Sequence, residues 1–232
     1  MKEIVEVLKP FDEVTLVPHE KGLQVLALDP SHVYLCKLVI DKSKVMKVEV
    51  NKDEKVGLYP EVVEKLLKRV PVDSKATLEV TEGLGVLNVE GRGSRLVRFL
   101  VPAPGEVKDV NIPYDAEAEV DARSLYQTVA DMKGLYDDVQ VIISKGMVFV
   151  RGVGGKIVTD GIYRFGETVS VTASDEEVRS TFQIKFLLDI LKAIKGLGII
   201  KVGLSTDKPL VIKAQTVFGS LNYYLAPKVG EG

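Results

Sequence analysis

The chain has 232 residues, enough for one or two domains of ordinary size and for a core that folds without disulfides. Its single cysteine, Cys36, excludes a secreted scaffold held together by internal disulfides. A net charge of −2 excludes a surface that is basic throughout, and no apolar run reaches the roughly 18 residues of a membrane span. The N-terminus carries Glu3 and Glu6 where a signal peptide has an apolar stretch. We therefore expect a soluble, intracellular protein.

The predicted elements repeat one order four times, a helix followed by several strands. Period-two alternation rich in β-branched residues indicates the strands, and 3.6-residue apolar spacing indicates the helices. In chain order they are a helix at 2–9 with strands at 14–17, 23–28 and 32–40; a strand at 45–50, a helix at 60–70 and strands at 76–80, 85–90 and 96–101; a strand at 116–120, a helix at 122–133 and strands at 139–143, 147–151 and 156–159; a strand at 178–182, a helix at 183–195 and strands at 200–204, 210–214 and 220–225.

Four such copies, grouped two by two, predict two similar α+β domains. The expected boundaries are 1–101 for the first domain and 116–232 for the second. The segment between them, 102–115, contains Pro102, Pro104 and Pro113 and shows no long periodic pattern, which is typical of a connector. The first copy differs from the others because no strand precedes its helix.

Each predicted helix has an apolar face and a polar face. The apolar stripes include Val63, Leu66, Leu67 and Val70 in the second helix, and Ile184, Leu187, Leu188 and Leu191 in the fourth. Lysines lie off these stripes, while acids concentrate in loops such as 51–54 and 174–177. In a single helix, lysines on an ordinary solvated face are the commoner explanation. Basic faces on three of the four helices favour a surface that attracts phosphates through many weak contacts.

No arrangement of residues indicates catalysis. Residues 152–156, Gly-Val-Gly-Gly-Lys, differ from a phosphate-binding loop because Ile157 follows the lysine and a strand, rather than a helix, is predicted next. His19 and His32 have no Cys or His neighbour at metal-ligand spacing, and Asp137 falls in a polar turn. We expect no enzyme activity, no cofactor and no metal.

Several segments resemble one family. Residues 26–33, Leu-Ala-Leu-Asp-Pro-Ser-His-Val, resemble the (A/S)-M-D-(P/S)-S-(H/R)-V segment of the proliferating cell nuclear antigen family, the archaeal and eukaryotic DNA sliding clamps. Leu28 stands where that segment usually has Met. Residues 223–229 are similar to the family's Y-L-A-P-(K/R) ending, residues 207–212 to its (D/E)-x-P-(L/M) strand start, and residues 110–113 to its interdomain connector. The matches keep the family's order over nearly the whole chain.

The resemblance implies a clamp fold, in which three subunits close head to tail into a ring with sheets outside and helices lining the hole. Duplex DNA would thread the hole without sequence preference, and the clamp would act as a processivity factor in the prokaryotic cytoplasm, at the nucleoid. Short hydrophobic peptide motifs would bind DNA polymerase, clamp loader, flap endonuclease and DNA ligase, with no membrane involved. A homotrimer and a heterotrimer of paralogous subunits both remain open. The alternative function is a non-enzymatic protein-interaction scaffold that does not encircle DNA.

Carried over by position, the resemblance implies two sets of site residues. The residues expected to face DNA are Lys2, Lys9, Lys65, Lys68, Arg69, Arg123, Lys133, Lys185, Lys192 and Lys195. The residues expected to bind a partner peptide are Leu28, His32, Val33, Val110, Ile112, Pro113, Pro209 and Tyr224, with the terminal Ala226, Pro227, Lys228 and Val229 pairing as an extended strand. Without the resemblance, core packing is the favoured explanation for Leu28, Val33 and Ile112. Subunits are expected to meet between residues 96–101 and 157–165.

Overall fold

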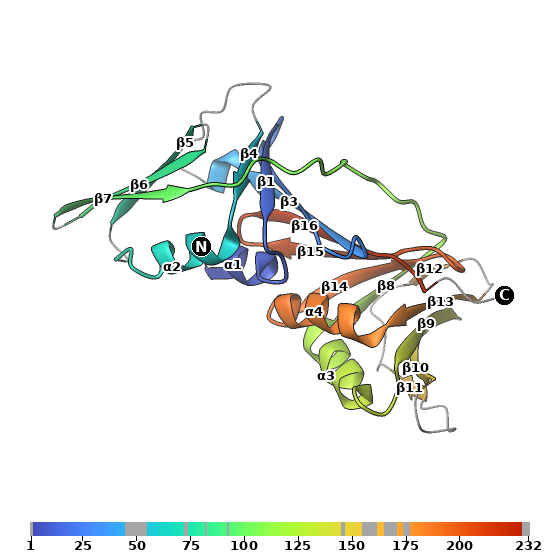
Figure 1. Ribbon diagram of the computed structural model, residues 1–232. Coiled ribbons are helices and arrows are strands. Elements are labelled where there is room, and N and C mark those ends of the chain that lie inside the picture. The colour runs from blue at the N-terminus through green and yellow to red at the C-terminus, as the bar shows by residue number, and fades with distance from the viewer. Residues whose placement is uncertain are drawn as a thin grey trace. The chain divides into compact units, whose positions relative to one another are not determined.

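The chain divides into two compact units in a computed structural model (Figure 1). The first unit comprises Met1–Pro30, Lys37–Asp109 and Val217–Gly219, and the second comprises Ser31–Cys36, Val110–Thr216 and Ser220–Gly232. Within them, the structure describes residues 2–44, 55–71, 74–81, 83–91, 93–144, 147–154, 162–164, 171–173 and 177–228. None of the helices in these ranges has the length and apolar character that crossing a bilayer requires.

The first unit combines two short helices with two sheets. Its elements are α1 (Lys2–Leu8), β1 (Val14–His19), β2 (Gly22–Leu28), the second part of β3 (Tyr34–Asp41), a 3-10 turn η1 (Lys42–Lys44), β4 (Val56–Leu58), α2 (Pro60–Leu67), β5 (Lys75–Thr81), β6 (Leu84–Glu90) and β7 (Ser94–Leu100). One sheet has the order β3-β2-β1-β4 and the other β5-β6-β7. The helices α1 and α2 contact each other. Pro60 begins α2, at a position where a missing N–H group costs nothing.

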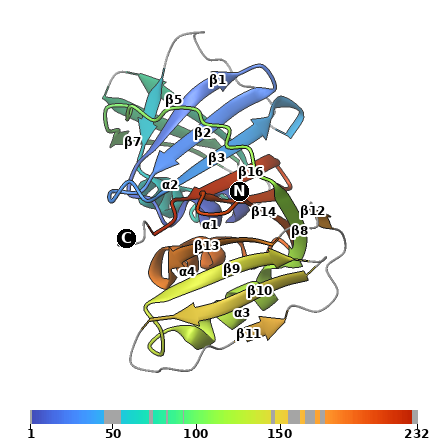
Figure 2. The ribbon, with the colours of Figure 1, turned by 90° about the vertical axis from the view of Figure 1, so that its right-hand side faces the viewer.

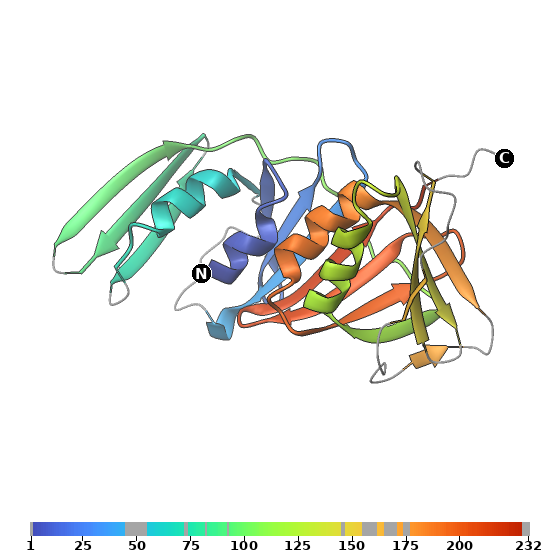
Figure 3. The same cartoon turned by 90° about the horizontal axis from the view of Figure 1, so that it is seen from below.

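The second unit has two longer helices. Its elements are β8 (Ala116–Asp121), α3 (Ala122–Met132), β9 (Asp138–Ser144), β10 (Met147–Val153), β11 (Ile162–Arg164), β12 (Val171–Ala173), β13 (Val178–Gln183), α4 (Ile184–Ile194), β14 (Ile199–Leu204), β15 (Leu210–Thr216) and β16 (Gly219–Leu225). One sheet runs β12-β8-β14-β15-β16, and the other runs β11-β10-β9-β13. Figure 2 shows the second sheet in front, and Figure 3 shows α3 and α4 side by side.

Local signals explain the helices of the second unit. Asp121 caps α3, because its Oδ1 accepts a hydrogen bond of 2.8 Å from the backbone N–H of Ser124. In α4, seven side chains are buried, namely Ile184, Phe186, Leu187, Leu188, Ile190, Leu191 and Ile194. The strands β9 and β13 bury Val139 and Phe182 completely, so the helices and this sheet share an apolar core.

The α+β fold and the four helices agree with the sequence-based expectation, and the predicted stripe of α4 is buried as expected. In α2, however, Val63 and Leu66 are only half-buried. The first-unit helices are seven and eight residues long, against eleven for α3 and α4, so they have fewer turns with which to bury an apolar stripe. Two strands, β4 and β12, were not predicted, because three residues are too few to show a period, whereas β11 lies within residues 157–165, which the resemblance implied as a subunit-contact edge.

Two predicted strands, 45–50 and 156–159, lie outside the described residues. Residues 101–114 form neither helix nor strand, and the chain passes from the first unit to the second after Asp109. The predicted domain limits, 1–101 and 116–232 with the connector 102–115, stay a prediction.

Candidate nucleic-acid interface and partner site

The helix α4 carries exposed amines opposite its buried face. Lys185, Lys192 and Lys195 are exposed, and Lys195 is the C-cap residue. Two of these amines lie over aromatic rings: Lys195 Nζ is 4.6 Å from the ring centroid of Tyr126 in α3, and Lys185 Nζ is 5.2 Å from that of Phe186. From residue 184 to 195 the chain has three lysines and one aspartate, so this helix is net positive. Such a row of flexible amines attracts a polyanion.

The helix α3 presents a basic residue near each end. Arg123 is exposed in its first turn, and Lys133 is exposed at its C-cap. A cation at the C-terminal end of a helix is stabilised by the partial negative charge of the helix dipole. The pKa of Asp121 is lowered by hydrogen bonds from the backbone and then the side chain of Ser124, and more weakly by the charge of Arg123.

In the first unit, the basic residues follow or end the helices and pair with acids. Lys65 of α2 forms an ion pair with Glu61, and Nζ of the C-cap residue Lys68 lies 2.7 Å from Glu64 Oε1, the partners of each pair being four residues apart. Lys9, just after α1, lies 4.0 Å from the carboxylate of Glu6. The hydrogen bond from Lys68 lowers the pKa of Glu64 despite some desolvation.

Two further DNA-facing candidates complete this set. Lys2 begins α1, but its side chain lies outside the described residues. Arg69 is exposed after α2, and its backbone oxygen accepts a 2.6 Å hydrogen bond from Arg95 Nη2. The two arginines line a cavity of about 260 Å³ together with Ser74 and Ser94. Arg95 was not predicted, because basic residues were expected on the polar faces of helices and Arg95 lies on β7.

The predicted partner residues of the second unit differ in exposure. Val33 and Pro209 are half-buried, while Tyr224 on β16 is only 5% exposed. His32 is exposed and has a φ of +58°, a left-handed conformation. The remaining candidate, Leu28, ends β2 in the first unit and is half-buried. The two cavities described in the first unit, of about 260 and 520 Å³, are lined by none of the partner residues. The partner pocket itself stays a prediction.

The connector alternates in exposure where the partner site was predicted. Val110 and Ile112 are half-buried, while Asn111 and Pro113 are exposed. This alternation is what an extended segment produces when one side of it faces the protein. An extended segment therefore presents Asn111 and Pro113 to solvent.

The C-terminal tail is bonded to its own unit. The backbone N–H of Ala226 donates to the oxygen of Val33 at 2.8 Å, and that of Lys228 donates to Thr181 at 2.7 Å. Lys228 Nζ also lies 2.5 Å from Oδ2 of the buried Asp138. Pro227 is half-buried and has no N–H to donate, and Val229 lies outside the described residues. The structure thus brings Val33 and Ala226 together, and it ties Lys228 to β9 and β13.

Among the described residues, no three or more His, Cys, Asp or Glu side chains are grouped as metal ligands. Cys36 is fully buried and shares a hydrogen bond with Tyr223, and burial raises the pKa of its thiol strongly.

The chain is similar to known proteins over nearly its full length. A family model described as "Proliferating cell nuclear antigen, C-terminal domain" matches residues 108–228. "DNA polymerase sliding clamp 1" of Sulfolobus acidocaldarius is 26% identical, with 99% of this chain and 96% of that protein covered. "DNA polymerase sliding clamp 2" of Pyrobaculum aerophilum is also 26% identical, over 96% of this chain and 92% of the relative.

Two solved structures share the fold. The proliferating cell nuclear antigen of Thermococcus kodakaraensis superimposes with a TM-score of 0.82 at 19% identity, covering 98% of this chain and 95% of that one. A chain of the PCNA2–PCNA3 complex from Sulfolobus tokodaii gives a TM-score of 0.79 at 19% identity, covering 97% and 94%. At this level of identity, the likeness establishes the fold.

Proposed function

This chain belongs to the proliferating cell nuclear antigen family, and from that premise we infer that it is a subunit of a DNA polymerase sliding clamp. A sliding clamp raises the processivity of DNA synthesis by keeping the polymerase on its template. The observation that carries this function is the exposure of basic side chains on or beside the helices of both units, opposite the buried face in α4.

The helices contact DNA through charge alone in this proposal. Lysine and arginine side chains on α2, α3 and α4 neutralise phosphates and release counterions, a contribution that is independent of sequence. Phosphate contacts carry no base information, so the duplex can move past them. The whole chain has a net charge of −2, and the excess positive charge of α4 is therefore balanced by acids elsewhere.

The ring is proposed to close through edge strands. Within the described part of the first unit, β7 is the last strand of its sheet, and Leu96 and Leu100 are 51% and 77% exposed. An exposed edge with apolar side chains is suited to pair with another strand. We place its partner in residues 157–165 of the next subunit, of which the described part is β11. The neighbour is a second copy or a paralogous subunit.

Partner enzymes are proposed to bind the connector and the tail. Val110, Ile112, Pro113 and the tail 226–229 would receive a short peptide with hydrophobic anchors, with Leu28, His32, Val33, Pro209 and Tyr224 forming the rest of the site. Because Pro227 has no N–H, the tail can only accept a hydrogen bond there, so the peptide has to supply the donor. The proposed partners are DNA polymerase, clamp loader, flap endonuclease and DNA ligase.

The chain itself is proposed to carry out no chemistry. The clamp acts by holding enzymes on DNA, in the prokaryotic cytoplasm at the nucleoid, and needs no cofactor. Purified protein is therefore expected to turn over neither nucleotides nor DNA.

The test combines assembly mass, polymerase stimulation and retention on primed circular DNA. We expect a trimer, alone or with paralogous subunits, that stimulates a polymerase. The variant Lys65→Glu/Lys68→Glu should lower retention, because it places four carboxylates on α2 and its C-cap, whereas Lys21→Glu/Lys44→Glu, on exposed lysines outside the α-helices, should not. A lasting monomer with every partner, without stimulation, would instead identify a scaffold. Unchanged retention of the α2 variant at low and physiological salt would contradict the DNA-facing assignment.

A further inference from the structure

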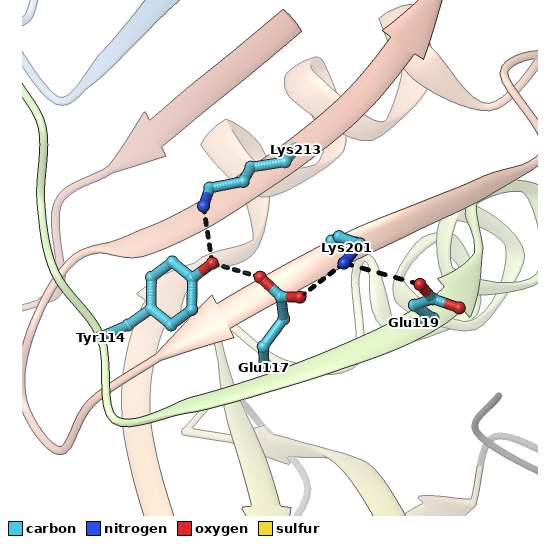
Figure 4. Close-up of polar contacts among 5 residues, drawn as sticks. All are labelled: Tyr114, Glu117, Glu119, Lys201 and Lys213. Atoms are coloured by element: carbon cyan, nitrogen blue, oxygen red, sulfur yellow. Dashed lines mark hydrogen bonds and ion pairs between the residues drawn. The ribbon is translucent and has the colours of Figure 1, made fainter. Parts of the chain in front are cut away.

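The end of the connector is seated on the second unit by one aromatic ring. Tyr114, the residue after Pro113, lies over Gly203 of β14 (Figure 4 shows the tyrosine and its polar partners). A Cβ atom added to Gly203 would come within 2.5 Å of Cδ1 of the ring and within 2.7 Å of two further ring atoms. The glycine therefore leaves a slot on the sheet that the ring fills, and no other residue type fits beneath it without a shift.

Polar contacts hold the hydroxyl group of the same side chain. Lys213 Nζ donates to the Tyr114 hydroxyl at 2.6 Å and lies 4.6 Å from the ring centroid. The hydroxyl in turn donates to Glu117 Oε2, and Lys201 Nζ lies 2.8 Å from Glu117 Oε1 and 3.7 Å from Glu119 (Figure 4). Desolvation alone would raise the pKa of Glu117, but hydrogen bonds from Lys201 and Tyr114 lower it. Lys213 and Glu117 thus hold the hydroxyl group directly, and Lys201 holds Glu117 in turn, so the ring is fixed in rotation as well as in position.

The backbone directly after Tyr114 is fixed by hydrogen bonds, while residues 110–113 directly before it are not. The N–H of Asp115 donates to Ser205 Oγ at 2.9 Å and lies 3.2 Å from the oxygen of Leu204. At the other end, in the first unit, Asp109 accepts hydrogen bonds from Lys37 at 2.5 Å and Gln24 at 3.2 Å. Residues 110–113 make no hydrogen bond to the rest of the described chain. The predicted partner-binding stretch is therefore located by its two ends.

We propose that Tyr114 is a positioning residue for partner recognition: its ring, seated over Gly203 and held by Lys213 and Glu117, sets where residues 110–113 lie. The inference rests on the proposed function, because it deepens the role of the connector. A peptide that meets an ordered connector does not have to order it on binding. If the ordered state becomes a minor one, the apparent affinity falls in proportion to its population.

The experiment measures peptide affinity by fluorescence polarisation on the full chain. The probe is a labelled synthetic peptide of about twelve residues with one glutamine and two aromatic anchors. Tyr114→Ala and Gly203→Ala should each weaken binding roughly tenfold, and Tyr114→Phe, which keeps the ring, should weaken it less. The double variant Tyr114→Ala/Gly203→Ala should be no weaker than either single variant, because both act on one contact and the added methyl then fits.

A second glycine in the same unit provides a matched control. A Cβ on Gly152 of β10 would come within 2.3 Å of the ring of Tyr136, away from the connector in the chain. Gly152→Ala should disturb packing in the same way yet leave peptide affinity unchanged. Hydrogen exchange gives a readout without a partner: the amide of Asp115, which is bonded to Ser205 and Leu204, should exchange faster in Tyr114→Ala, while retention on DNA stays at the wild-type level.

Two results would overturn the inference separately from the proposed function. One is a folded Tyr114→Ala variant whose peptide affinity stays within about twofold of the wild type with unchanged exchange at the amide of Asp115. The other is an equal loss of affinity in Gly152→Ala, which would make the effect one of general stability. A wild-type chain that binds no such peptide and stimulates no polymerase would overturn the proposed function, and the inference with it.

Discussion

In the first unit, Lys65 and Lys68 of α2 lie against Glu61 and Glu64 of the same helix, whereas in the second unit Lys185 and Lys192 of α4 contact no carboxylate among the described residues. From residue 60 to 69 the chain has three basic and two acidic residues, and from 184 to 195 it has three and one. Helices of similar amphipathic character therefore present different amounts of available positive charge. We infer that the second unit contributes more to holding DNA.

The two units also differ in how firmly their helices are packed. Seven side chains of α4 are buried, whereas the described apolar side chains of α2 after Pro60 are half-buried. The first unit further contains a cavity of about 520 Å³ beside α1 and the start of α2, lined in part by Val5, Phe11 and Tyr59. Unfilled volume next to a helix means fewer dispersion contacts. The helix that carries the exposed lysines of the second unit, α4, is thus packed more tightly against its own unit than α2 is.

The largest expected effect is on affinity for duplex DNA, and it distinguishes lysines without an ion pair from lysines that have one. Lys185→Gln/Lys192→Gln removes two unpaired charges and should lower affinity for duplex DNA on the order of tenfold at physiological salt, with the salt slope reduced by about one per lysine. The fourfold variant Glu61→Gln/Glu64→Gln/Lys65→Gln/Lys68→Gln removes two complete ion pairs and should change affinity less than about twofold. Titration of a duplex at several salt concentrations measures both, and equal losses in the two variants would contradict the comparison.

The next largest effect is on stability and concerns the N-cap of α3. Asp121→Ala should cost about 1 kcal/mol of unfolding free energy, because it removes the side-chain cap of α3. The pKa of Asp121 is lowered in the folded state, so its contribution is present above the unfolded pKa and is lost as the pH falls through the folded value. Denaturation at neutral and acidic pH should show the difference from wild type shrinking in acid.

The control for Asp121→Ala is a variant that keeps a capping acceptor, and α2 provides a helix without a side-chain cap for comparison. Asp121→Asn keeps an acceptor for the N–H of Ser124 and should lose little stability at neutral pH. In α2, Tyr59 makes no side-chain capping bond, and Pro60 begins the helix instead, so the start of α2 has no carboxylate cap to lose in acid. A loss in Asp121→Ala that does not depend on pH would show that packing, and not the cap, is responsible.

The smallest expected effect is a gain in affinity for DNA. Glu61→Gln/Glu64→Gln frees the two lysines of α2 and should tighten DNA binding by about two- to threefold, since the amines no longer have to leave an ion pair. Glu13→Gln/Glu20→Gln makes the same change of charge in exposed loops of the first unit and should gain less. An equal gain in both variants would mean that overall charge, and not pairing on the helix, sets the affinity.

The sequence was sufficient for the parts of the fold that depend on local periodicity. The stripe Ile184, Leu187, Leu188 and Leu191 repeats at helical spacing, and all four side chains are buried. The strands β4 and β12 were not predicted because they form by pairing with neighbours distant in sequence, as Val56–Leu58 does with β1. Arg95 and Tyr114 were not predicted for a related reason. Arg95 is distinguished by its contact with Arg69, 26 positions away, and Tyr114 by its contact with Gly203, 89 positions away.

The order of residues alone determined the family resemblance, the α+β class, the four helices and the basic character of their polar faces, because each depends on composition or on spacing within one element. Only the tertiary structure decided which lysines are paired and which are free, where the connector is anchored, and that the N–H groups of the tail already have acceptors. These features depend on distances between atoms of separate elements. Only folding brings those atoms within the few ångströms over which hydrogen bonds and ion pairs act.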